Sequence, residues 1–508
     1  MAKLLIEDEA DVVIIGTGAG GATAARVLAG AGLSLVMLEE GPLLRTADRP
    51  VELIHAMRRA MRDFGTFTTR GTHPFPLLQG RCVGGSTAIN SGIIWRIPED
   101  VRRDWIDNHG LEQLVEEKGL ERAFDIIEDE LQVAETGEQI AGNNALAMKR
   151  AAEKLGLPGK PMRRNAKNCQ GSGECLQGCP NEARQSMDVS YVPRAMRDGA
   201  RLHAMCRATK VRIERGRAVG VEGVVIDPET KRPHGRFFIR ARRAVIVAAS
   251  VIWTPVLLRR SGLRGLVGDR LQLHPGSAVV GKFPEPISMG TGATQAFEIP
   301  MRDRGFKIES LTLPPEMLAT RLPGAGPAWQ RMLTDLDHYA QWASIIRMKA
   351  HGTVRPAFAA ALTENSAAQS DADVRFTPLE RDMRVMREAL STICRLMFAA
   401  GATEVYPGIA RLPQVMTDVS QVELIERADI THADVHMMCS HLFGTAVAGR
   451  DAATSVVGPD LQTHDVRDLY VMDASVFPTN MGVNPQHTIM ALVWRAAERL
   501  AAQARAAA

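Results

Sequence analysis

The sequence shows no excess of charge of one sign. Its 508 residues include 61 lysine and arginine residues against 58 aspartate and glutamate residues, which leaves a net charge of +3 at pH 7. Proteins that bind nucleic acids concentrate positive charge on one face, and this balance does not indicate such a partner. Local basic runs such as 241–245 (ARRAV) are more typical of solvated strand ends. We therefore expect no nucleic-acid partner.

Long hydrophobic runs are also absent. No apolar run approaches the roughly 20 residues that a membrane-spanning helix needs. Residues 1–10 (MAKLLIEDEA) contain no apolar segment, twin arginine or cleavage site typical of an export signal. We expect a cytoplasmic protein without a membrane span, with export alongside a partner protein as the alternative.

Cysteine and aromatic residues are few. The seven cysteines, three of them within residues 169–179, do not form the framework of a secreted disulfide-rich domain. Aromatic residues make up 5% of the chain, whereas hydrophobic residues make up 45% and charged residues 23%, as in ordinary globular proteins. A chain of this length predicts two or three intertwined domains.

The first forty residues follow a strand–helix–strand pattern. Residues 11–15 (DVVII) are a short, β-branched run, which is typical of a buried parallel strand. A glycine-rich turn at 16–21 follows, then a helical pattern at 22–28 and a second strand at 35–38. This order predicts the start of an α/β nucleotide-binding fold.

The glycine-rich turn carries the motif G-x-G-x-x-G, formed by Gly16, Gly18 and Gly21. Glycine permits a tight turn and a close backbone approach to a pyrophosphate, while the next helix offers free N–H groups. Glu39 stands at a strand end, 21 residues beyond Gly18, where a carboxylate accepts hydrogen bonds from ribose hydroxyls. These features favour FAD or NAD over NADP. The alternative is a glycine turn with a structural role alone.

The last seventy or so residues carry polar groups of another kind. Asn484–Pro485 stand directly before a predicted helix, His441 lies upstream, and Asp473 lies between them. Polar groups at the start of a helix suit the reactive edge of a flavin, where negative charge develops. Together with the glycine motif, they predict one site built from both ends of the chain. That site points to a flavin-dependent oxidoreductase.

Four stretches of the chain resemble the glucose-methanol-choline (GMC) oxidoreductase family. They are residues 12–42, 80–100 (GRCVGGSTAINSGIIWRIPED), 244–262 and 440–502, and they appear in the family's order. Within the family, the terminal stretch most resembles cholesterol oxidases and bacterial alcohol dehydrogenases. The middle third of the chain resembles no family that we can name.

The resemblance implies an α/β fold, in which a Rossmann-type FAD-binding domain is interleaved with an α+β substrate domain. The expected FAD-binding part is 1–269, with a Cys-rich loop inserted at 161–185. The substrate-binding part is 270–435, and 436–508 return to the FAD-binding domain with the catalytic residues.

The resemblance also implies which residues contact the cofactor. Asp473 would contact the pyrophosphate or ribityl chain, with a turn cap as its alternative role. Some family members attach FAD to a histidine where this chain has Ile89, so we expect non-covalent FAD. The other residues placed along the flavin and pyrophosphate are Gly84, Gly85, Ser86 and Asn90.

By the same resemblance, His441 is the catalytic histidine and Asn484 its partner. A neutral imidazole accepts or organises the proton of an alcohol hydroxyl, while Asn484 donates a hydrogen bond to the substrate oxygen. Pro485 suits the first turn of the following helix, whose dipole stabilises negative charge on the reduced flavin. His487, one turn further on, is a less favoured candidate for the same site.

Cys169, Cys175 and Cys179 form a second unusual motif, C-x5-C-x3-C-P. Three thiolates among small residues suit a [3Fe-4S] cluster, and the spacing resembles that of the iron–sulfur subtype of family dehydrogenases. Buried thiols, or one local disulfide, are the alternative.

The sequence therefore predicts an FAD-dependent enzyme that oxidises an alcohol to an aldehyde or ketone. A cluster would pass electrons to a partner protein, a small subunit or a quinone. The first alternative is an oxygen-using oxidase with structural cysteines, and the second is a non-catalytic flavin-binding subunit. Few aromatics and scattered methionines in residues 270–435 favour a bulky apolar alcohol over a sugar.

Overall fold

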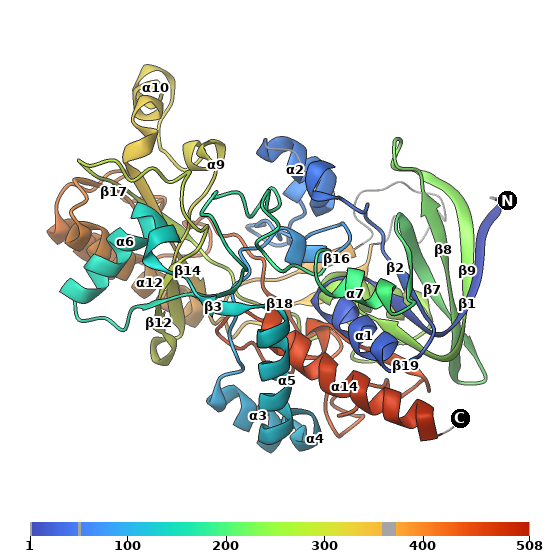
Figure 1. The fold of residues 1–508 in the computed structure, drawn as a ribbon. Coiled ribbons are helices and arrows are strands. Elements are labelled where there is room, and N and C mark those ends of the chain that lie inside the picture. The colour runs from blue at the N-terminus through green and yellow to red at the C-terminus, as the bar shows by residue number, and fades with distance from the viewer. Residues whose placement is uncertain (1–2, 49–51, 358–371, 507–508) are drawn as a thin grey trace.

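The computed structural model describes residues 3–48, 52–357 and 372–506. Two sheets organise this part of the chain, and both are visible in Figure 1. The first sheet lies near the N- and C-terminal ends, and the second lies at the opposite side of the molecule. Red and blue ribbons adjoin around the first sheet, so the two ends of the chain share one half of the fold.

The first sheet has seven strands among the described residues, in the order β6-β2-β1-β9-β8-β7, with β19 also pairing with β9. Its strands are β1 (Leu4–Ile15), β2 (Leu35–Leu38), β6 (Arg201–His203), β7 (Cys206–Glu214), β8 (Arg217–Ile226), β9 (Pro233–Val247) and β19 (Leu469–Val471). β6, β2, β1, β9 and β19 run parallel, whereas β7 and β8 extend β9 as antiparallel strands. The parallel part is the predicted Rossmann-type sheet.

The parallel strands form where the sequence has short, continuous apolar runs. Residues 12–15 of β1 and 244–247 of β9 are buried along their whole length, and so is β2. Strands covered on both faces need apolar side chains at every position, because neither face reaches water. The predicted strand at 35–38 is therefore confirmed at both ends. The predicted strands at 11–15 and 244–248 are the C-terminal parts of longer strands, because β1 begins at Leu4 and β9 at Pro233.

The helices complete both halves of the fold. In the described residues they are α1 (Ala19–Gly30), α2 (Leu53–Ala60), α3 (Glu99–His109), α4 (Glu112–Val115), α5 (Glu117–Glu130), α6 (Glu138–Lys154), α7 (Tyr191–Arg197), α8 (Ser250–Arg260), α9 (Pro315–Ala319), α10 (Gly326–Thr334), α12 (Glu380–Ala400), α13 (Glu423–Arg427) and α14 (Gln486–Ala506). α1 packs against α14, which places the first helix beside the last (Figure 1). α14 begins one residue later than the predicted Pro485.

The second sheet has the strand order β17-β11-β14-β13-β12-β4 and is antiparallel. Its strands are β4 (Lys160–Pro161), β11 (Ala278–Lys282), β12 (Phe297–Met301), β13 (Phe306–Ser310), β14 (Tyr339–Ile346) and β17 (Glu404–Tyr406). Short pairs elsewhere are β3 (Val133–Glu135) with β5 (Arg163–Asn165), β10 (Gln272–Leu273) with β18 (Leu442–Phe443), and β15 (Thr353–Pro356) with β16 (Ala372–Arg375).

Side chains alternate between the two faces of the second sheet. On β13, Phe306 and Ile308 join the core that α12 and α6 cover, where Met386 and Leu390 also lie. Because successive residues of a strand point to opposite faces, the intervening Lys307 points to the other face. That face looks toward the first sheet and supplies part of the candidate site.

The boundary of the substrate-binding part differs from the prediction in one respect. β4, at residues 160–161, pairs with β12, and α6 packs against α12. The second half of the fold therefore takes in a segment from before residue 270, in addition to the described part of 270–435. Residues 1–2, 49–51, 358–371 and 507–508 of the predicted domains lie outside the described residues.

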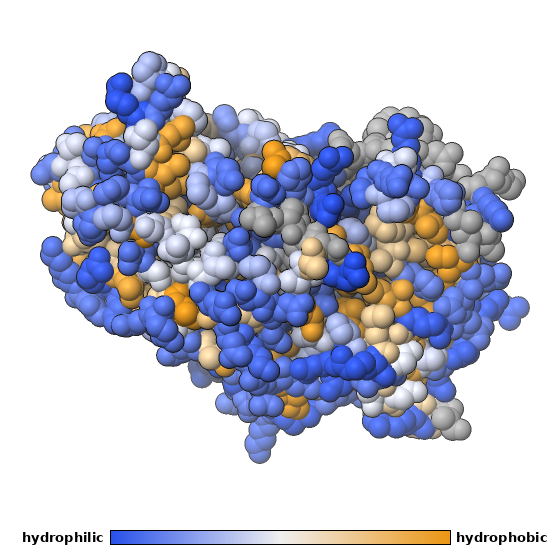
Figure 2. All heavy atoms as spheres, turned by 45° about the horizontal axis from the view of Figure 1, so that its top comes forward, coloured by the Kyte–Doolittle hydropathy of each residue, from blue (hydrophilic) through white to orange (hydrophobic). Residues whose placement is uncertain are grey.

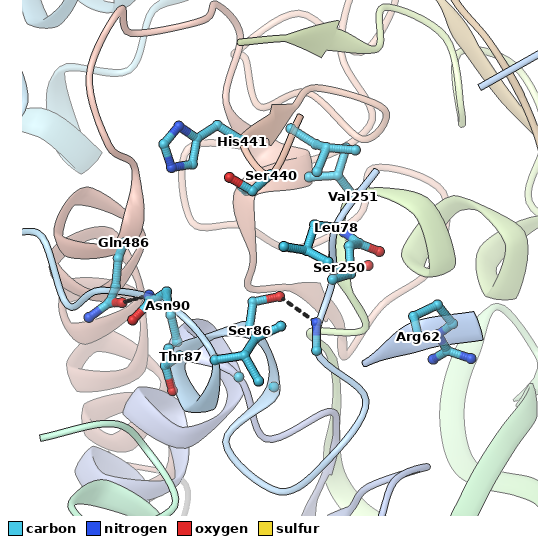
Figure 3. Close-up of a pocket in the computed structure, with 18 of the residues that line it drawn as sticks. Arg62, Leu78, Ser86, Thr87, Asn90, Ser250, Val251, Ser440, His441 and Gln486 are labelled. Atoms are coloured by element: carbon cyan, nitrogen blue, oxygen red, sulfur yellow. Dashed lines mark hydrogen bonds between the residues drawn. The ribbon is translucent and has the colours of Figure 1, made fainter. Parts of the chain in front are cut away.

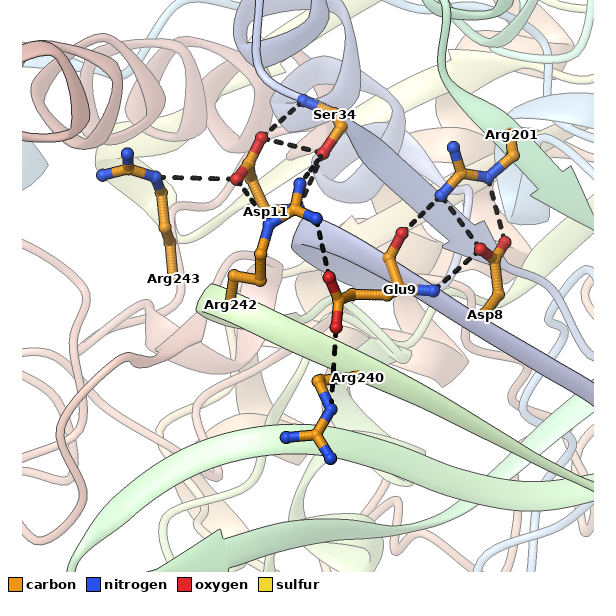
Figure 4. A network of polar contacts seen from close by, with 8 residues as sticks. All are labelled: Asp8, Glu9, Asp11, Ser34, Arg201, Arg240, Arg242 and Arg243. Atoms are coloured by element: carbon orange, nitrogen blue, oxygen red, sulfur yellow. Dashed lines mark hydrogen bonds and ion pairs between the residues drawn. The ribbon is translucent and has the colours of Figure 1, made fainter. Parts of the chain in front are cut away.

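The basic run at 241–245 pairs with acidic residues of β1 (Figure 4). Arg242 donates to Asp11 and to Glu9, and Asp11 also accepts hydrogen bonds from Ser34. Although burial raises the pKa of Asp11, these hydrogen bonds and the charge of Arg242 lower it to about 2. The arginines thus tie β9 to β1. The prediction of a solvated strand end is wrong in one respect, because the run lies within β9, which continues to Val247.

The face shown in Figure 2 is mostly hydrophilic, with hydrophobic side chains in small separate groups. None of the helices in the described ranges is both long enough and apolar enough to cross a membrane.

The parallel sheet gives a test of the fold. Ile246 is fully buried near the C-terminal end of β9, where β9 lies between β1 and β19. We expect Ile246→Ala to lower the free energy of unfolding by about 2–5 kcal/mol, because the cavity left behind closes only in part. Ile54→Ala is the matched control, since Ile54 is 59% exposed. Denaturant unfolding measures both, and equal effects would contradict the assigned core.

Candidate active site

A cavity of about 410 Å³ lies between the two sheets. Its wall combines the turn after β1, the end of β2, residues 78–93, the start of α8, strands of the second sheet and the residues before α14. Figure 3 shows side chains from several of these segments converging on it. Of the predicted site residues, ten line the cavity: Gly16, Gly18, Glu39, Gly85, Ser86, Asn90, His441, Asp473, Asn484 and Pro485.

The glycines of the first motif have different roles. A Cβ on Gly16 would lie 2.2 Å from the Ala248 carbonyl oxygen, and one on Gly21 would lie 1.9 Å from the Gly16 carbonyl oxygen. Both positions therefore need glycine for packing of the turn and of α1. A Cβ on Gly18 would meet nothing within 4 Å. Gly18 faces the cavity, so its missing side chain leaves space for a ligand at the start of α1.

Glu39 follows β2 and lies at the cavity wall, but its oxygens bond to the protein. Oε2 accepts hydrogen bonds from the backbone N–H and hydroxyl of Thr17 at 3.1 and 2.7 Å, and Oε1 accepts one from the Gly41 N–H. Burial raises its pKa. Glu39 thus fixes the glycine turn, and its contact with a ribose stays a prediction.

The second glycine pair adopts left-handed backbone angles. Gly84 has φ of 92° and Gly85 has φ of 53°. A Cβ on Gly84 would meet Asp188, and Gly84 does not line the cavity, so its role is packing. A Cβ on Gly85 would lie 3.0 Å from the Cα of Gly18. The two glycine turns therefore approach each other closely at one end of the cavity.

Ser86 and Asn90 continue along the same wall (Figure 3). Ser86 Oγ accepts a hydrogen bond from the Gly80 N–H, and Asn90 Nδ2 donates to Gln486 Oε1 at 2.6 Å. The Nε2 of Gln486 is buried and has no partner among the described residues. A polar ligand would therefore find a donor available at the start of α14.

Asp473 lies at the cavity wall at the end of β19, as predicted. Its oxygens accept hydrogen bonds from Ser250, Thr254 and Ser475, with the Thr254 hydroxyl at 2.6 Å. Burial raises its pKa. These bonds correspond to the alternative role of a turn cap, and contact with the cofactor stays a prediction.

His441 lines the cavity and stands directly before β18 in the chain. Within the described residues, no hydrogen bond engages its ring. Burial and, to a smaller extent, the positive charge of Lys307 lower the pKa of His441 to about 3. The imidazole is therefore neutral at neutral pH, and a ring nitrogen is free to accept a proton or a hydrogen bond.

His274 is a second cavity histidine, which the sequence analysis missed. Its ring makes an edge contact with that of His441, with 5.8 Å between centroids. The Nε2 atom accepts a hydrogen bond from the Gly482 N–H at 2.8 Å, so the proton of the neutral ring sits on Nδ1. Burial, with the neighbouring His441, holds the pKa of His274 well below its usual value. His274 packs behind the predicted catalytic histidine.

Asn484 contacts a lysine that the sequence analysis also missed. Lys307 Nζ donates to Asn484 Oδ1 at 2.6 Å, and both side chains are buried. Lys307 also pairs with Glu298 and, at 2.8 Å, with Glu309, which lines the cavity. The only sequence signal for Lys307 is the alternation of charged and apolar residues in FKIES, residues 306–310. Successive residues of a strand point to opposite faces, so this alternation places the charged residues on one face and the apolar residues on the other.

His487 does not share the site. Its Nε2 lies 3.0 Å from Glu128 Oε1, and its ring packs on Phe124 of α5. His487 lies on the face of α14 that packs against α5, so its side chain does not line the cavity.

The three cysteines of the loop at 161–185 lie together but do not form a metal site. They line a separate space of about 10 Å³, roughly the room of a single water molecule. Arg164 directs one guanidinium nitrogen to Cys169 Sγ at 3.7 Å and another to Cys175 Sγ at 3.4 Å. The described residues contain no group of three or more side chains placed to hold a metal ion.

The neighbouring arginines also act on the charge state of these cysteines. All three cysteines are unbridged. Burial raises the pKa of Cys175, but the positive charges of Arg164 and Arg184 and a hydrogen bond from Thr294 lower it by more. The Arg164 guanidinium contacts two of the three sulfur atoms, and the space that the cysteines line is about 10 Å³. The residues therefore do not fit a [3Fe-4S] cluster as folded, and the predicted cluster and metal site are not supported.

Comparisons with known proteins agree with the fold and the cavity. The sequence models of the GMC oxidoreductase family match residues 10–276 and 359–492. An uncharacterised GMC-type oxidoreductase of Mycobacterium tuberculosis is 33% identical over 97% of this chain and 76% of its own length. Another, from Sinorhizobium fredii, is 32% identical over 96% and 94%. A long-chain-alcohol oxidase of Arabidopsis thaliana is 26% identical over 96% and 68%.

Solved structures share the fold. A formate oxidase of Aspergillus oryzae has a TM-score of 0.73 at 15% identity, covering 99% of this chain and all of its own. The pyridoxine 4-oxidase of Mesorbium loti has a TM-score of 0.68 at 16% identity, covering 98% and 99%.

The fold and cavity define a flavin-dependent oxidoreductase with an FAD-binding α/β fold. The chain belongs to the GMC oxidoreductase family. The site fits FAD: the open space at Gly18, the N-terminus of α1 and the free donor of Gln486 are features that the cofactor would use. The predicted family and fold class are confirmed.

Gly18 gives a test of the cofactor site. We expect Gly18→Val to fold but to purify without flavin, because the new side chain occupies the space at the start of α1. Gly290→Val is the matched control, since a Cβ there also meets nothing within 4 Å but lies outside the cavity. Flavin absorbance per protein and circular dichroism report on both variants. A fully flavin-loaded Gly18→Val protein would place the cofactor elsewhere.

Proposed function

We propose that this enzyme oxidises an alcohol to an aldehyde or ketone and uses dioxygen as the electron acceptor. Bound FAD, held non-covalently because Ile89 replaces an attachment histidine, would take the hydride from the carbinol carbon. The observation that carries the proposal is the neutral imidazole of His441 facing the same cavity as the amide of Asn484. The overall reaction converts an alcohol and O₂ to a carbonyl compound and hydrogen peroxide.

His441 is the group that accepts the hydroxyl proton. Its ring is neutral because burial lowers its pKa to about 3, so it enters the reaction unprotonated. Removal of the hydroxyl proton places negative charge on the substrate oxygen, and this charge makes hydride departure from the carbon favourable. His274, whose tautomer is set by the Gly482 N–H, supports the His441 ring from behind.

Asn484 holds the substrate oxygen. Its Oδ1 is occupied by Lys307, so its Nδ2 is the atom available to a ligand. A donor aimed at an oxygen that becomes negative stabilises the transition state more than the ground state. The N-terminus of α14 adds a positive dipole end at the same place.

The cavity wall near these residues favours an apolar alcohol. Ile345 pairs across strands with Lys307, which places it beside Asn484. The neighbouring wall carries several apolar side chains, together with the polar and charged side chains of Gln295, Glu309 and Arg321, of which Arg321 bonds to His436. The apolar lining residues are Leu78, Leu311, Leu313, Met317 and Ile345. The long-chain-alcohol oxidase relative accords with this substrate class.

The choice of dioxygen replaces the predicted electron route through an iron–sulfur cluster. Arg164 contacts the sulfur atoms of Cys169 and Cys175, the space beside them is about 10 Å³, and the described residues contain no group of side chains placed to hold a metal ion. Several relatives and solved structures of this fold are oxidases by name. An electron-acceptor protein or small subunit is therefore not required, and such a partner stays a prediction of the sequence alone.

His441 gives the first test. We expect His441→Ala to lower kcat by at least about a hundredfold, the range for loss of a general base, while FAD stays bound. His432→Ala is the control, because His432 bonds to Thr72 and lies outside the cavity. Peroxide release with a long-chain primary alcohol measures both. Turnover near that of the unmodified enzyme in His441→Ala would remove the assigned role.

The cysteine loop gives the second test. We expect the anaerobically purified protein to contain flavin but no stoichiometric iron or labile sulfide, and Cys175→Ser to keep peroxide-forming activity. Metal analysis and a low-temperature EPR spectrum check this. A three-iron signal that disappears in Cys175→Ser would restore the cluster and, with it, an acceptor other than dioxygen.

A further inference from the structure

Lys307 is a fully buried cation in direct contact with Asn484. Its side chain is 0% exposed, and its Nζ donates to Asn484 Oδ1 at 2.6 Å. A buried ammonium is costly unless it is paired and hydrogen-bonded. Its position behind Asn484, which lines the cavity, therefore calls for an explanation beyond packing, since an apolar side chain on β13 would fill the same volume without that cost.

The chemistry of the two side chains fixes how they pair. A lysine ammonium has three donors and no acceptor, whereas an asparagine amide has one oxygen acceptor and an NH₂ donor. The opposite amide orientation would set donor against donor in a buried site. Lys307 therefore selects one of the two orientations of Asn484, the one in which Nδ2 is the atom left for the cavity.

We propose that Lys307 is a positioning residue, which holds the Asn484 amide with its Nδ2 donor directed at the substrate oxygen. This inference rests on the proposed function, in which Asn484 binds that oxygen. Without the lysine, the amide would rotate and present its acceptor to the substrate for part of the time. The donor would then have to be reoriented in each turnover.

The surrounding sheet keeps the ammonium in place. Glu298 on β12 and Glu309 on β13 are direct cross-strand partners, and two carboxylates so placed would repel each other. The ammonium of Lys307 pairs with both carboxylates, and its positive charge offsets their repulsion. The Trp95 indole N–H donates to Glu298 at 3.0 Å, and its ring lies 5.1 Å from Nζ. A site held by strands is more exact than one held by loops.

The same cation acts on His441 through space. Its positive charge contributes to the low pKa of His441, and the two carboxylates keep the pKa of Lys307 raised despite burial. Removal of the lysine charge would therefore raise the pKa of His441. The acid limb of the pH profile of kcat/KM would move to higher pH, an effect that a purely structural role would not produce.

The test is a double-mutant cycle on the flavin-loaded enzyme with Lys307→Met and Asn484→Ala. We expect Lys307→Met to lower kcat by about tenfold to a hundredfold, as for a misplaced catalytic group, with a smaller change in KM. The double variant should be no slower than Asn484→Ala, because the lysine acts through the amide. Losses that multiply in the double variant would overturn the inference.

Lys282→Met is the matched control. Lys282 belongs to the same sheet, on β11, and pairs with Asp335 outside the cavity. Its replacement also removes a paired ammonium, and we expect kcat and the pH profile to stay unchanged. If the acid limb of the pH profile of kcat/KM did not move in Lys307→Met, the inference would be overturned, as it would be by losses of kcat that multiply in the double variant.

A second variant keeps the inference testable if Lys307→Met does not fold. Asn484→Asp retains Lys307 and strengthens its contact, but it removes the amide donor. We expect kcat to fall as far as in Asn484→Ala, and a kcat close to that of the unmodified enzyme would overturn the inference. If Asn484→Ala itself is fully active, the proposed function of Asn484 fails, whereas an impaired Asn484→Ala with multiplying losses removes only the role of Lys307.

Discussion

The parallel pairing of β19 with β9 is the constraint on which the site depends. β9 already pairs with β1, so the addition of β19 sets the C-terminal segment beside the glycine turn that follows β1. The contact between α1 and α14 reinforces the same juxtaposition. Parallel strands carry their loops at one edge, and residues more than 400 positions apart thereby meet at one cavity. Without this pairing, the glycine turn and Asn484 would belong to separate surfaces.

The second sheet turns the cavity into a reactive site. α12 and α6 cover its apolar face, so the face with Lys307 and Glu309 is free to look toward the first sheet. Because the apolar side chains pack on the helices, the charged side chains of this sheet, Lys307 and Glu309, lie together beside Asn484. Burial of those groups and of His441 removes water from them, which strengthens each polar interaction in the cavity. The neutral imidazole and the oriented amide both follow from that burial.

The cysteine loop shows how the same residues take another role in a folded context. In the sequence alone, the spacing of Cys169, Cys175 and Cys179 suits three ligands of a cluster. In the fold, the Arg164 guanidinium contacts two of the sulfur atoms, and the space beside the cysteines is about 10 Å³. Arg164 lies outside the motif, on the neighbouring strand β5, so the spacing alone carried no sign of it.

The sequence by itself determined the Rossmann-type start, the FAD-binding family and most of the predicted cavity residues. Glycine motifs, apolar strands and an Asn-Pro pair before a terminal helix are local patterns with local physical causes. Gly16, Gly18, Ser86, His441 and Asn484 all line the cavity as expected. Only the tertiary structure decided that Gly21 and Gly84 serve packing, that His487 faces α5, and that Lys307, Glu309 and His274 join the site. These assignments depend on which strand faces which neighbour. That is set by sheet order and long-range pairing, which no local pattern encodes.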